Sequence, residues 1–462
     1  MWKPIYQPEP WPQFRKRKDI VSLPLMEQRK KYMQEQLLFE NYLSTLNTLN
    51  TVSPSVSSAA SGGGGPKPSA APTGPIFPKY TIDTQYNFEG DQWGLYTKDQ
   101  GITKEDVFFL FGWGTYQGNK SPDFTEAIVD WGDGNVEVLT NYNFSFIISD
   151  IVSSNQFARA VRHTYSTPGS YTISITGDGA YDLRPSTAPI VDILSFDQNA
   201  YNGTQQNPVG PSLRHAFYGN RFLGMSENSI NAISNWDVSQ VIDFAGCFAG
   251  IIQSPQWLFR SASEQIDVFP EPLPNVENWD VSSAKEITRM FSGRVNFSQS
   301  LANWDVSNCS KGEGVFYYCE NLVSGARADL WNPDLSAPWY SGWYGTFRGS
   351  MTSPSARGTM PHIGNWNLSN IPEGSTNYFY DIFKDSGFSH TAVGETLIGW
   401  ASQSAVPNSI GVASSAFSNT WDGSGFSNPL YDTGSAFGLE VSASYDYLVT
   451  TKGWTIPNFT FS

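Results

Sequence analysis

The chain has 462 residues, enough for two or three domains with sizeable cores. Aromatic and charged residues each make up 15% of it, a balance typical of β-rich surface proteins and unlike that of helical enzymes. The net charge is −15, but residues 1–50 hold eight Lys and Arg against five Asp and Glu, a local +3 that leaves −18 for the rest. Such an acidic body repels phosphate, which argues against nucleic-acid binding by the main domains.

Residues 1–50 are predicted to form a docking arm and a helix. The first part is rich in Pro and Trp, and Pro24 opens a Gly-free run of helix formers that predicts a helix over about 24–47. Its apolar residues recur every seven positions, which favours packing on a partner or on copies of itself, as a homo-oligomer. The alternative is an ordinary helix folded back on this chain. The recurring residues are Leu25, Tyr32, Phe39 and Leu46.

Residues 51–78 consist almost entirely of Ser, Ala, Gly, Pro and Thr, which predicts a flexible linker. The first residues lack the apolar run of a secretion signal, and no later window reaches the length of a membrane helix. We therefore expect a chain that is neither exported through a signal nor inserted in a membrane.

Residues 79–185 are expected to form a β-sandwich. The segments 127–139 and 161–177 alternate apolar and polar residues around tight turns. The "DWGDG" turn followed by "HTYSTPGSYTISITG" resembles the PKD-type immunoglobulin-like sandwich, whose role is that of a spacer or binding module. The motif residues are Trp131, His163, Tyr165, Pro168, Gly169 and Tyr171.

Residues 186–462 contain a repeat. "NWDVS" occurs three times, and each copy places Val two residues after the Trp and Phe twelve residues after it. The Trp and Val share one face of an extended segment, which predicts a short strand. Apolar residues five, eight, eleven and twelve positions after each Trp predict a short helix. The repeat-core residues are Trp236, Val238, Phe248, Trp279, Val281, Phe291, Trp304, Val306 and Phe316.

One such unit cannot bury its apolar side alone, so the units must stack into a solenoid of about six or seven. Degenerate copies follow at Trp331 and Trp366, and "KGWTI" closes the series at Lys452. Over about 104–456 the chain resembles the BspA-like leucine-rich-repeat surface proteins, which implies an adhesin-like body. It departs from them in its irregular units after residue 320. The predicted fold is mostly β and multidomain: an N-terminal helix and linker, a PKD-like sandwich, and a leucine-rich-repeat-type solenoid with a C-terminal cap.

No residue pattern predicts catalysis or a cofactor, because the four histidines are dispersed and no nucleophile, zinc or phosphate-loop motif occurs. The oxygens of Asp130, Asp133 and Asn135 form a weak candidate calcium site. The stronger interpretation is a tight turn, which uses Asp and Asn beside Gly. The three cysteines are interpreted as small apolar core residues; they are Cys247, Cys309 and Cys319.

A recognition surface is predicted in "APWYSGWYGTF", residues 337–347. Its aromatic residues outnumber what one alternating core face can use, so some should be exposed to stack on sugars or contact protein. Packing of the whole cluster in the core is an equal alternative. The candidate binding residues are Trp339, Tyr340, Trp343 and Tyr344.

The first 50 residues resemble the N-terminal arms of structural proteins from tailed marine bacteriophages. Virions leave the cell by lysis, so an adhesin-like body without an export signal fits a virion. We therefore expect a non-enzymatic virion protein (a fibre, a tail- or neck-associated protein, or a capsid decoration) that contacts other virion proteins through residues 1–50 and displays its body to a host surface protein or glycan. The alternative is an adhesin on a bacterial cell surface.

Overall fold

The computed structural model shows a mostly β, multidomain chain with few helices. The described residues belong to one compact unit, Gly74–Ser462. The predicted docking arm, the helix over 24–47 and nearly all of the linker lie outside them. The described residues are 76–86, 106–111, 126–139, 146–149, 157–177, 183–185, 188–197, 211–220, 222, 224–250, 273–338, 342–457 and 459–462.

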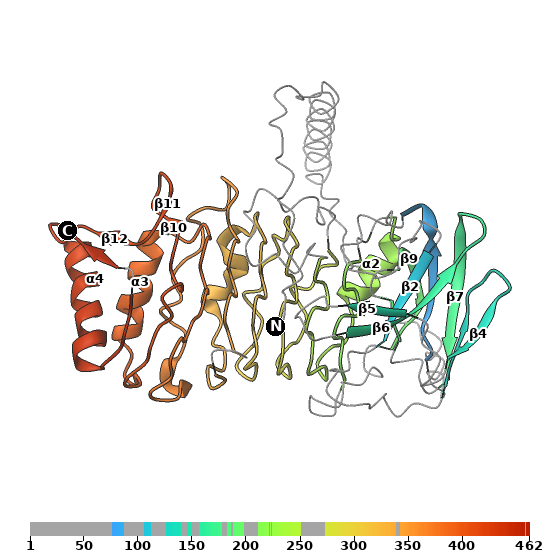
Figure 1. The fold of residues 1–462 in the computed structure, drawn as a ribbon, viewed down its shortest axis with the longest axis horizontal. Coiled ribbons are helices and arrows are strands. Elements are labelled where there is room, and N and C mark those ends of the chain that lie inside the picture. The colour runs from blue at the N-terminus through green and yellow to red at the C-terminus, as the bar shows by residue number, and fades with distance from the viewer. Residues whose placement is uncertain are drawn as a thin grey trace, which may run out of the picture. The chain divides into compact units, whose positions relative to one another are not determined.

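Two antiparallel sheets form the N-terminal part of this unit (Figure 1). In the first sheet the strands run in the order β4-β3-β7-β1-β9, and in the second β5-β6-β2-β8. Their bounds are β1 (Lys79–Asp83), β2 (Asp106–Phe111), β3 (Ala127–Asp130), β4 (Val136–Leu139), β5 (Phe146–Ser149), β6 (Phe157–Thr164), β7 (Ser170–Thr176), β8 (Leu183–Arg184) and β9 (Ile190–Ser195), with a short 3₁₀ turn, η1 (Thr84–Tyr86), after β1.

On the inner strands of the first sheet, β3, β7 and β1, buried side chains alternate with more exposed ones. On β1, Tyr80 and Ile82 are fully buried, and Ile173 and Ile175 on β7 are buried beside them. Val107 of β2 and Val161 of β6 are buried in the same hydrophobic cluster. The two sheets therefore contribute to one apolar interior.

Strand β9 moves the expected domain boundary. It pairs with β1, so the division expected between residues 185 and 186 falls before the last strand of the first sheet. The same strand also holds the start of the repeats: the Val191 carbonyl accepts from the Ser226 N–H at 2.8 Å, and the Ser229 hydroxyl accepts from the Ile193 N–H at 2.9 Å. Ser226 and Ser229 stand at the start of α2 (Glu227–Ser234).

The repeats stack through parallel backbone hydrogen bonds. Phe244, Gly246 and Phe248 donate to carbonyls 42 residues further along, at 2.8, 2.8 and 3.0 Å, and the intervening Cys247 N–H closes a turn on the Phe244 carbonyl. Alternate N–H groups thus bind the next unit or close a turn within their own. The same pattern begins at Leu213, Ile287, Gly312 and Gly345.

These segments contain left-handed residues, and the short helices predicted there are wrong. Ten positions after the Trp of each NWDVS copy, Gly246, Arg289 and Gly314 have φ of 59°, 54° and 56°. A helix needs negative φ at every residue, and it directs every N–H along its own axis. The apolar spacing of three and four nevertheless described burial correctly, because the residues at offsets five, eight, eleven and twelve are buried in all three copies.

The short strands predicted at the Trp and Val of each copy are also absent from the described elements: these positions have no regular secondary structure, and a turn begins at the Ser that follows. The cause is the Asp between them. Asp237, Asp280 and Asp305 each accept from the backbone N–H two residues on, at 3.1, 3.0 and 2.9 Å. This side-chain hydrogen bond closes a turn and competes with an extended conformation.

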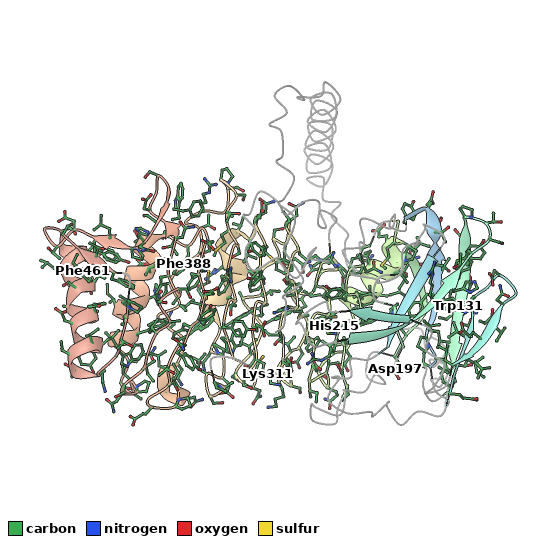
Figure 2. All side chains as sticks on the ribbon, in the orientation of Figure 1. Trp131, Asp197, His215, Lys311, Phe388 and Phe461 are labelled. Carbon is green, nitrogen blue, oxygen red and sulfur yellow. The ribbon has the colours of Figure 1, made fainter. Side chains whose placement is uncertain are left out.

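A column of phenylalanine rings runs through the stack. Neighbouring rings are nearly parallel, with interplanar angles of 6° to 20°, and their centroids are 5.0 to 6.1 Å apart. Phe388, labelled in Figure 2, stacks on one of them, Phe383, at 3.6 Å. The column consists of Phe217, Phe248, Phe291, Phe316, Phe347, Phe383 and Phe417.

A second column, of tryptophans, ties each unit to the preceding one. The indole Nε1–H of Trp279 donates to the Ile233 carbonyl at 3.1 Å, and that of Trp304 donates to the Val276 carbonyl at 3.0 Å. Each acceptor lies three residues before the preceding Trp and also accepts that Trp's own backbone N–H. The relation continues in Trp331 to Leu301, Trp366 to Ala328 and Trp400 to Ile363, at 2.9 to 3.2 Å.

The C-terminal part closes the series with two packed helices (Figure 1). Trp454 of the "KGWTI" segment donates to the Pro407 carbonyl at 2.8 Å. The elements after α2 are η6 (Val323–Leu330), η7 (Leu368–Asn370), α3 (His390–Ala401), β10 (Thr420–Trp421), β11 (Phe426–Ser427), β12 (Leu430–Tyr431), α4 (Ala436–Asp446), η8 (Tyr447–Thr451) and β13 (Thr460–Phe461).

The tryptophan column predicts a graded loss of stability. Trp279→Ala removes a ring that is 3% exposed and should lower the free energy of unfolding by about 3 to 5 kcal/mol. Trp279→Phe keeps most of the ring but removes the indole hydrogen bond to the Ile233 carbonyl and should cost about 1 to 2 kcal/mol. Trp236→Phe is the matched control, because Trp236 makes no indole hydrogen bond within the described residues. Denaturant titration measures all three, and equal stability of Trp279→Ala and wild type would contradict this arrangement.

Candidate recognition surface

The repeated motif itself is an internal scaffold. Val238, Val281 and Val306 are each 1% exposed, Trp279 and Trp304 are buried, and Trp236 is half-buried against the same core. Phe248, Phe291 and Phe316 are fully buried. The motif carboxylates act in turns: hydrogen bonds from Ser239 and Ser307 lower the pKa values of Asp237 and Asp305. A recognition surface must therefore be sought outside the motif.

The predicted aromatic cluster is only partly a surface. Trp339 and Tyr340 lie outside the described residues. The prediction that Trp343 is a binding residue is wrong. Its side chain is 3% exposed and its indole donates to the Cys309 carbonyl at 3.3 Å, so no face of the ring is open to a ligand. Tyr344 is half-buried, and its ring meets the more exposed ring of Tyr380 edge-on at 6.5 Å. The excess of aromatic residues in this segment is explained in part by the tryptophan column.

Largely buried ion pairs cross the units. Arg214 lies 2.7 Å from Asp243 and 2.7 Å from Glu286, and Glu286 also lies 3.2 Å from Lys311. These residues come from four successive units joined by parallel bridges. Arg289 with Glu313 and Arg348 with Asp381 form further pairs between units. The pairs hold neighbouring units in register and leave these carboxylates little capacity for a ligand.

The three candidate calcium ligands are occupied by their own turn. Asp130 accepts from the Gly132 N–H at 3.0 Å, and Asp133 accepts from the N–H and the side-chain amide of Asn135 at 3.0 Å each. His163 Nε2 lies 2.8 Å from the second Asp133 oxygen. Burial raises the pKa of Asp133, but these hydrogen bonds lower it more. The geometry is that of a tight turn fastened to β6.

The titratable side chains of the described part of the chain are mostly held in the core or in turns. No cluster of three or more His, Cys, Asp or Glu side chains that could hold a metal occurs there. The cysteines are free thiols in the core, and burial raises the pKa of Cys309 to about 12, which suppresses the reactive thiolate. His390 is 8% exposed, with Nε2 3.2 Å from the Ser427 carbonyl. None of these groups forms a nucleophile and base pair in the described contacts.

The structure brings together one cluster of an arginine and two aromatic rings that the sequence analysis did not predict. Arg357 lies over the rings of Trp421 and Phe426, with 4.9 and 5.3 Å from its central carbon to the centroids. These residues are 64 and 69 positions from Arg357 and belong to no repeated motif. Only the stacking of irregular units brings them together, so no spacing in the sequence reveals the group.

The comparisons with known proteins cover the early repeats. The family described as "Mycoplasma protein of unknown function, DUF285" matches residues 212–334, which include all three NWDVS copies but well under half of the chain. No curated protein and no solved structure matches significantly. Of the helices that the structure describes, none is long and apolar enough to cross a membrane. The repeats are therefore similar to that family, whose function is not established.

Glu286 predicts acid-sensitive stacking. Burial raises its pKa, but the charges and hydrogen bonds of Arg214 and Lys311 outweigh burial and hold the pKa below the ordinary 4.5. Because the pKa of Glu286 is lower in the folded chain than in the unfolded chain, ionised Glu286 stabilises the fold above pH 4.5. This stabilisation is lost as the pH falls through the lowered pKa. Glu286→Gln should cost about 3 kcal/mol at pH 7 because it leaves Arg214 and Lys311 undercompensated. Its melting midpoint should approach that of wild type in acid.

Glu440→Gln, at an exposed position on α4, is the control and should melt like wild type throughout. A Glu286→Gln deficit that is unchanged from pH 7 into acid would show that the ion pairs do not carry the effect.

The turn geometry predicts indifference to calcium. Millimolar calcium or its removal with EDTA should leave the melting midpoint of the full chain unchanged. A real calcium site at a hundred times its Kd would instead stabilise the fold by about 2.7 kcal/mol, which a melt would detect. A rise in the midpoint that disappears in Asp133→Asn would overturn this interpretation.

Proposed function

We propose that the chain is a non-enzymatic structural protein of a bacteriophage virion that displays an adhesin-like body for attachment to a surface. The observation that carries the proposal is the use of the repeated residues. The motif uses its Trp, Val, Phe and Asp side chains for stacking and turns. A recognition surface must therefore be formed by the irregular loops. This division suits a stiff carrier of a recognition surface and not a catalyst.

The finer fold proposed for this body is a PKD-like sandwich followed by a BspA-like leucine-rich-repeat solenoid. Support for the sandwich comes from its motif residues. The His163 ring stacks on Trp131 at 4.6 Å, and Tyr165 meets His163 edge-on and stacks on Tyr171 at 4.0 Å. The Tyr165 hydroxyl donates to the Trp131 carbonyl at 2.9 Å. The motif thus fastens the "DWGDG" turn to two other strands.

Support for the solenoid comes from the parallel hydrogen bonds and the two aromatic columns. Each unit leaves an apolar side that only its neighbour covers, which is the physical basis of solenoid repeats. The family match over residues 212–334 spans all three NWDVS copies, so the matched segment consists of several of these units.

The virion assignment is supported by the order of segments in the sequence. A basic, aromatic arm precedes a Ser, Gly and Pro linker, and an acidic body follows. This order suits an anchor, a tether and a displayed domain. In this proposal residues 1–50 contact other virion proteins, and copies can associate through the helix over 24–47.

A cell-surface adhesin is the second candidate. The family match favours it, because the repeats that match also resemble those of BspA-like surface proteins. Both candidates assign the same work to the body and differ in what the arm contacts.

Proteomics of purified particles separates the two candidates. We expect the chain in virions at a fixed ratio to the major capsid protein, which serves as the internal standard. Its absence from particles, together with its presence in a bacterial envelope fraction, would exclude the virion proposal.

The arm should dock independently of the body. A virion gene lacking the codons for residues 1–50 should give a folded, soluble chain that fails to enter particles. The deletion must stop well before residue 77, because the Phe77 carbonyl accepts from the Ser195 hydroxyl at 2.6 Å. Residues 1–50 fused to an unrelated soluble protein should carry it into particles. Normal incorporation of the shortened chain would place the anchor in the β domains.

A further inference from the structure

A surface cluster that we call the Arg357 clamp consists of Arg357, Trp421 and Phe426. Trp421 and Phe426 stand on the β10–β11 hairpin, which projects from one edge of the described body (Figure 1). The two rings meet at 62° with centroids 5.5 Å apart, and the Arg357 guanidinium lies over both. Phe426 is 36% exposed, so the clamp presents an aromatic surface to solvent.

The clamp is held in position by the backbone of the stack. The Gly387 carbonyl accepts from the Gly358 N–H at 2.8 Å, and the Phe388 carbonyl accepts from the Trp421 N–H at 2.9 Å. Consecutive carbonyls of one segment therefore fix the arginine loop and the hairpin. The Arg357 Nε–H donates to the Thr352 carbonyl at 2.7 Å, which fixes the guanidinium as well. A group held this firmly loses little entropy when it binds a ligand.

The charge of Arg357 distinguishes it from the arginines that join the units. Arg214, Arg289 and Arg348 face carboxylates, whereas Arg357 forms no ion pair with any carboxylate of the described residues. The carboxylate within the hairpin, Asp422, is occupied: it accepts from the Ser424 and Gly425 N–H groups at 2.7 Å each and from two hydroxyls. Among the described residues, no carboxylate therefore competes with an external anion for the Nη groups of Arg357.

Exposed hydroxyls and amides surround the clamp, together with the carboxylates of Asp422 and Asp385, which are hydrogen-bonded within the described residues. Ser424 and Asn428 are exposed on or beside the hairpin, and Asn419 is exposed at its base, where it donates to Asp385 at 2.7 Å. Flat aromatic faces bind sugar rings, polar side chains bind sugar hydroxyls, and a guanidinium binds a carboxylate through two parallel hydrogen bonds. An acidic peptide could use the guanidinium but would gain less from this hydroxyl and amide rim.

We propose that the Arg357 clamp binds a sugar that carries a carboxylate, of the uronic acid class. The sugar ring packs on the exposed side of Phe426, and its carboxylate accepts two hydrogen bonds from Arg357. This inference rests on the proposed function, since it names the chemistry of the surface to which the displayed body attaches.

Binding of trigalacturonate to the purified full-length chain tests the proposal by isothermal titration calorimetry. The uncharged comparison is galactotriose, and tetraglutamate is the acidic peptide. We expect trigalacturonate to bind roughly tenfold or more tightly than either, because a charge-assisted bidentate pair contributes at least that factor. Arg357→Gln and Phe426→Ala should each weaken trigalacturonate binding by roughly tenfold.

Matched variants separate the site from general effects of charge or folding. Lys285→Gln removes an exposed charge elsewhere and should bind like wild type. Arg357→Lys keeps the charge without the fork and should lose most of the preference for trigalacturonate. Melting midpoints identify any variant that fails to fold. If Arg357→Gln fails to fold, the binding of Arg357→Lys decides the test.

Equal binding of the charged and uncharged trimers, no binding of trigalacturonate, or unchanged affinity in Arg357→Gln would overturn the proposal. Tighter binding of tetraglutamate would assign the clamp to a protein partner instead. These results are independent of whether the chain is found in virions, so failure of the clamp and failure of the virion assignment are distinguishable.

Discussion

The hydrogen bond from a tryptophan indole to a carbonyl of the preceding unit is the interaction on which the repeat body depends. The accepting carbonyl, such as that of Ile233, also closes the turn that leads into its own unit's tryptophan. One oxygen therefore couples the shape of a unit to the position of the next. Tryptophan suits this position because it buries a large apolar area and also carries a hydrogen-bond donor. A buried donor needs an acceptor, and the carbonyl of the preceding unit supplies it. The recurrence of NWDVS follows, since the Trp joins units and the Asp closes the next turn.

Once the units are stacked, their outward side has little freedom. Alternate N–H groups serve the neighbouring unit, so the backbone between them must turn sharply, and left-handed residues make this possible. Gly246 has φ of 59° and lies so close to His215 that an added Cβ would be 2.5 Å from the His215 ring. Glycine is therefore favoured at this position for two reasons: it adopts the positive φ without strain, and it leaves room for the His215 ring. Largely buried ion pairs such as Arg214 with Glu286 then fix the register between units. The irregular loops lie outside this pattern, and the Arg357 clamp joins one of them to the β10–β11 hairpin.

The sequence predicts the internal side of the body well, because burial follows from spacing. The offsets from Trp236 and Trp279 identified apolar residues that are buried, and the same periodicity suggested helices that do not occur. Spacings of three and four fit a helix, but they also fit successive turns, and only the glycines at Gly246 and Gly314 argue for turns. The surface was less predictable. Trp343 was expected to be available, and it is buried because its ring packs edge-on between Trp331 and Trp366 of the column. The clamp joins Arg357 to Trp421 across irregular units, and such contacts depend on loop lengths that periodicity does not encode.

Hydrogen exchange of the indole N–H groups, followed by NMR on the tryptophan-labelled chain, tests the central claim most directly. The account predicts slow exchange for Trp279, Trp304, Trp331 and Trp366, whose Nε1–H groups donate to carbonyls of the preceding unit, and fast exchange for the half-buried Trp421. Protection should be lost together in acid as the ion pairs between units fail. Exchange of the four indoles at the rate of Trp421 would contradict the account, because the units could not then be joined through these bonds.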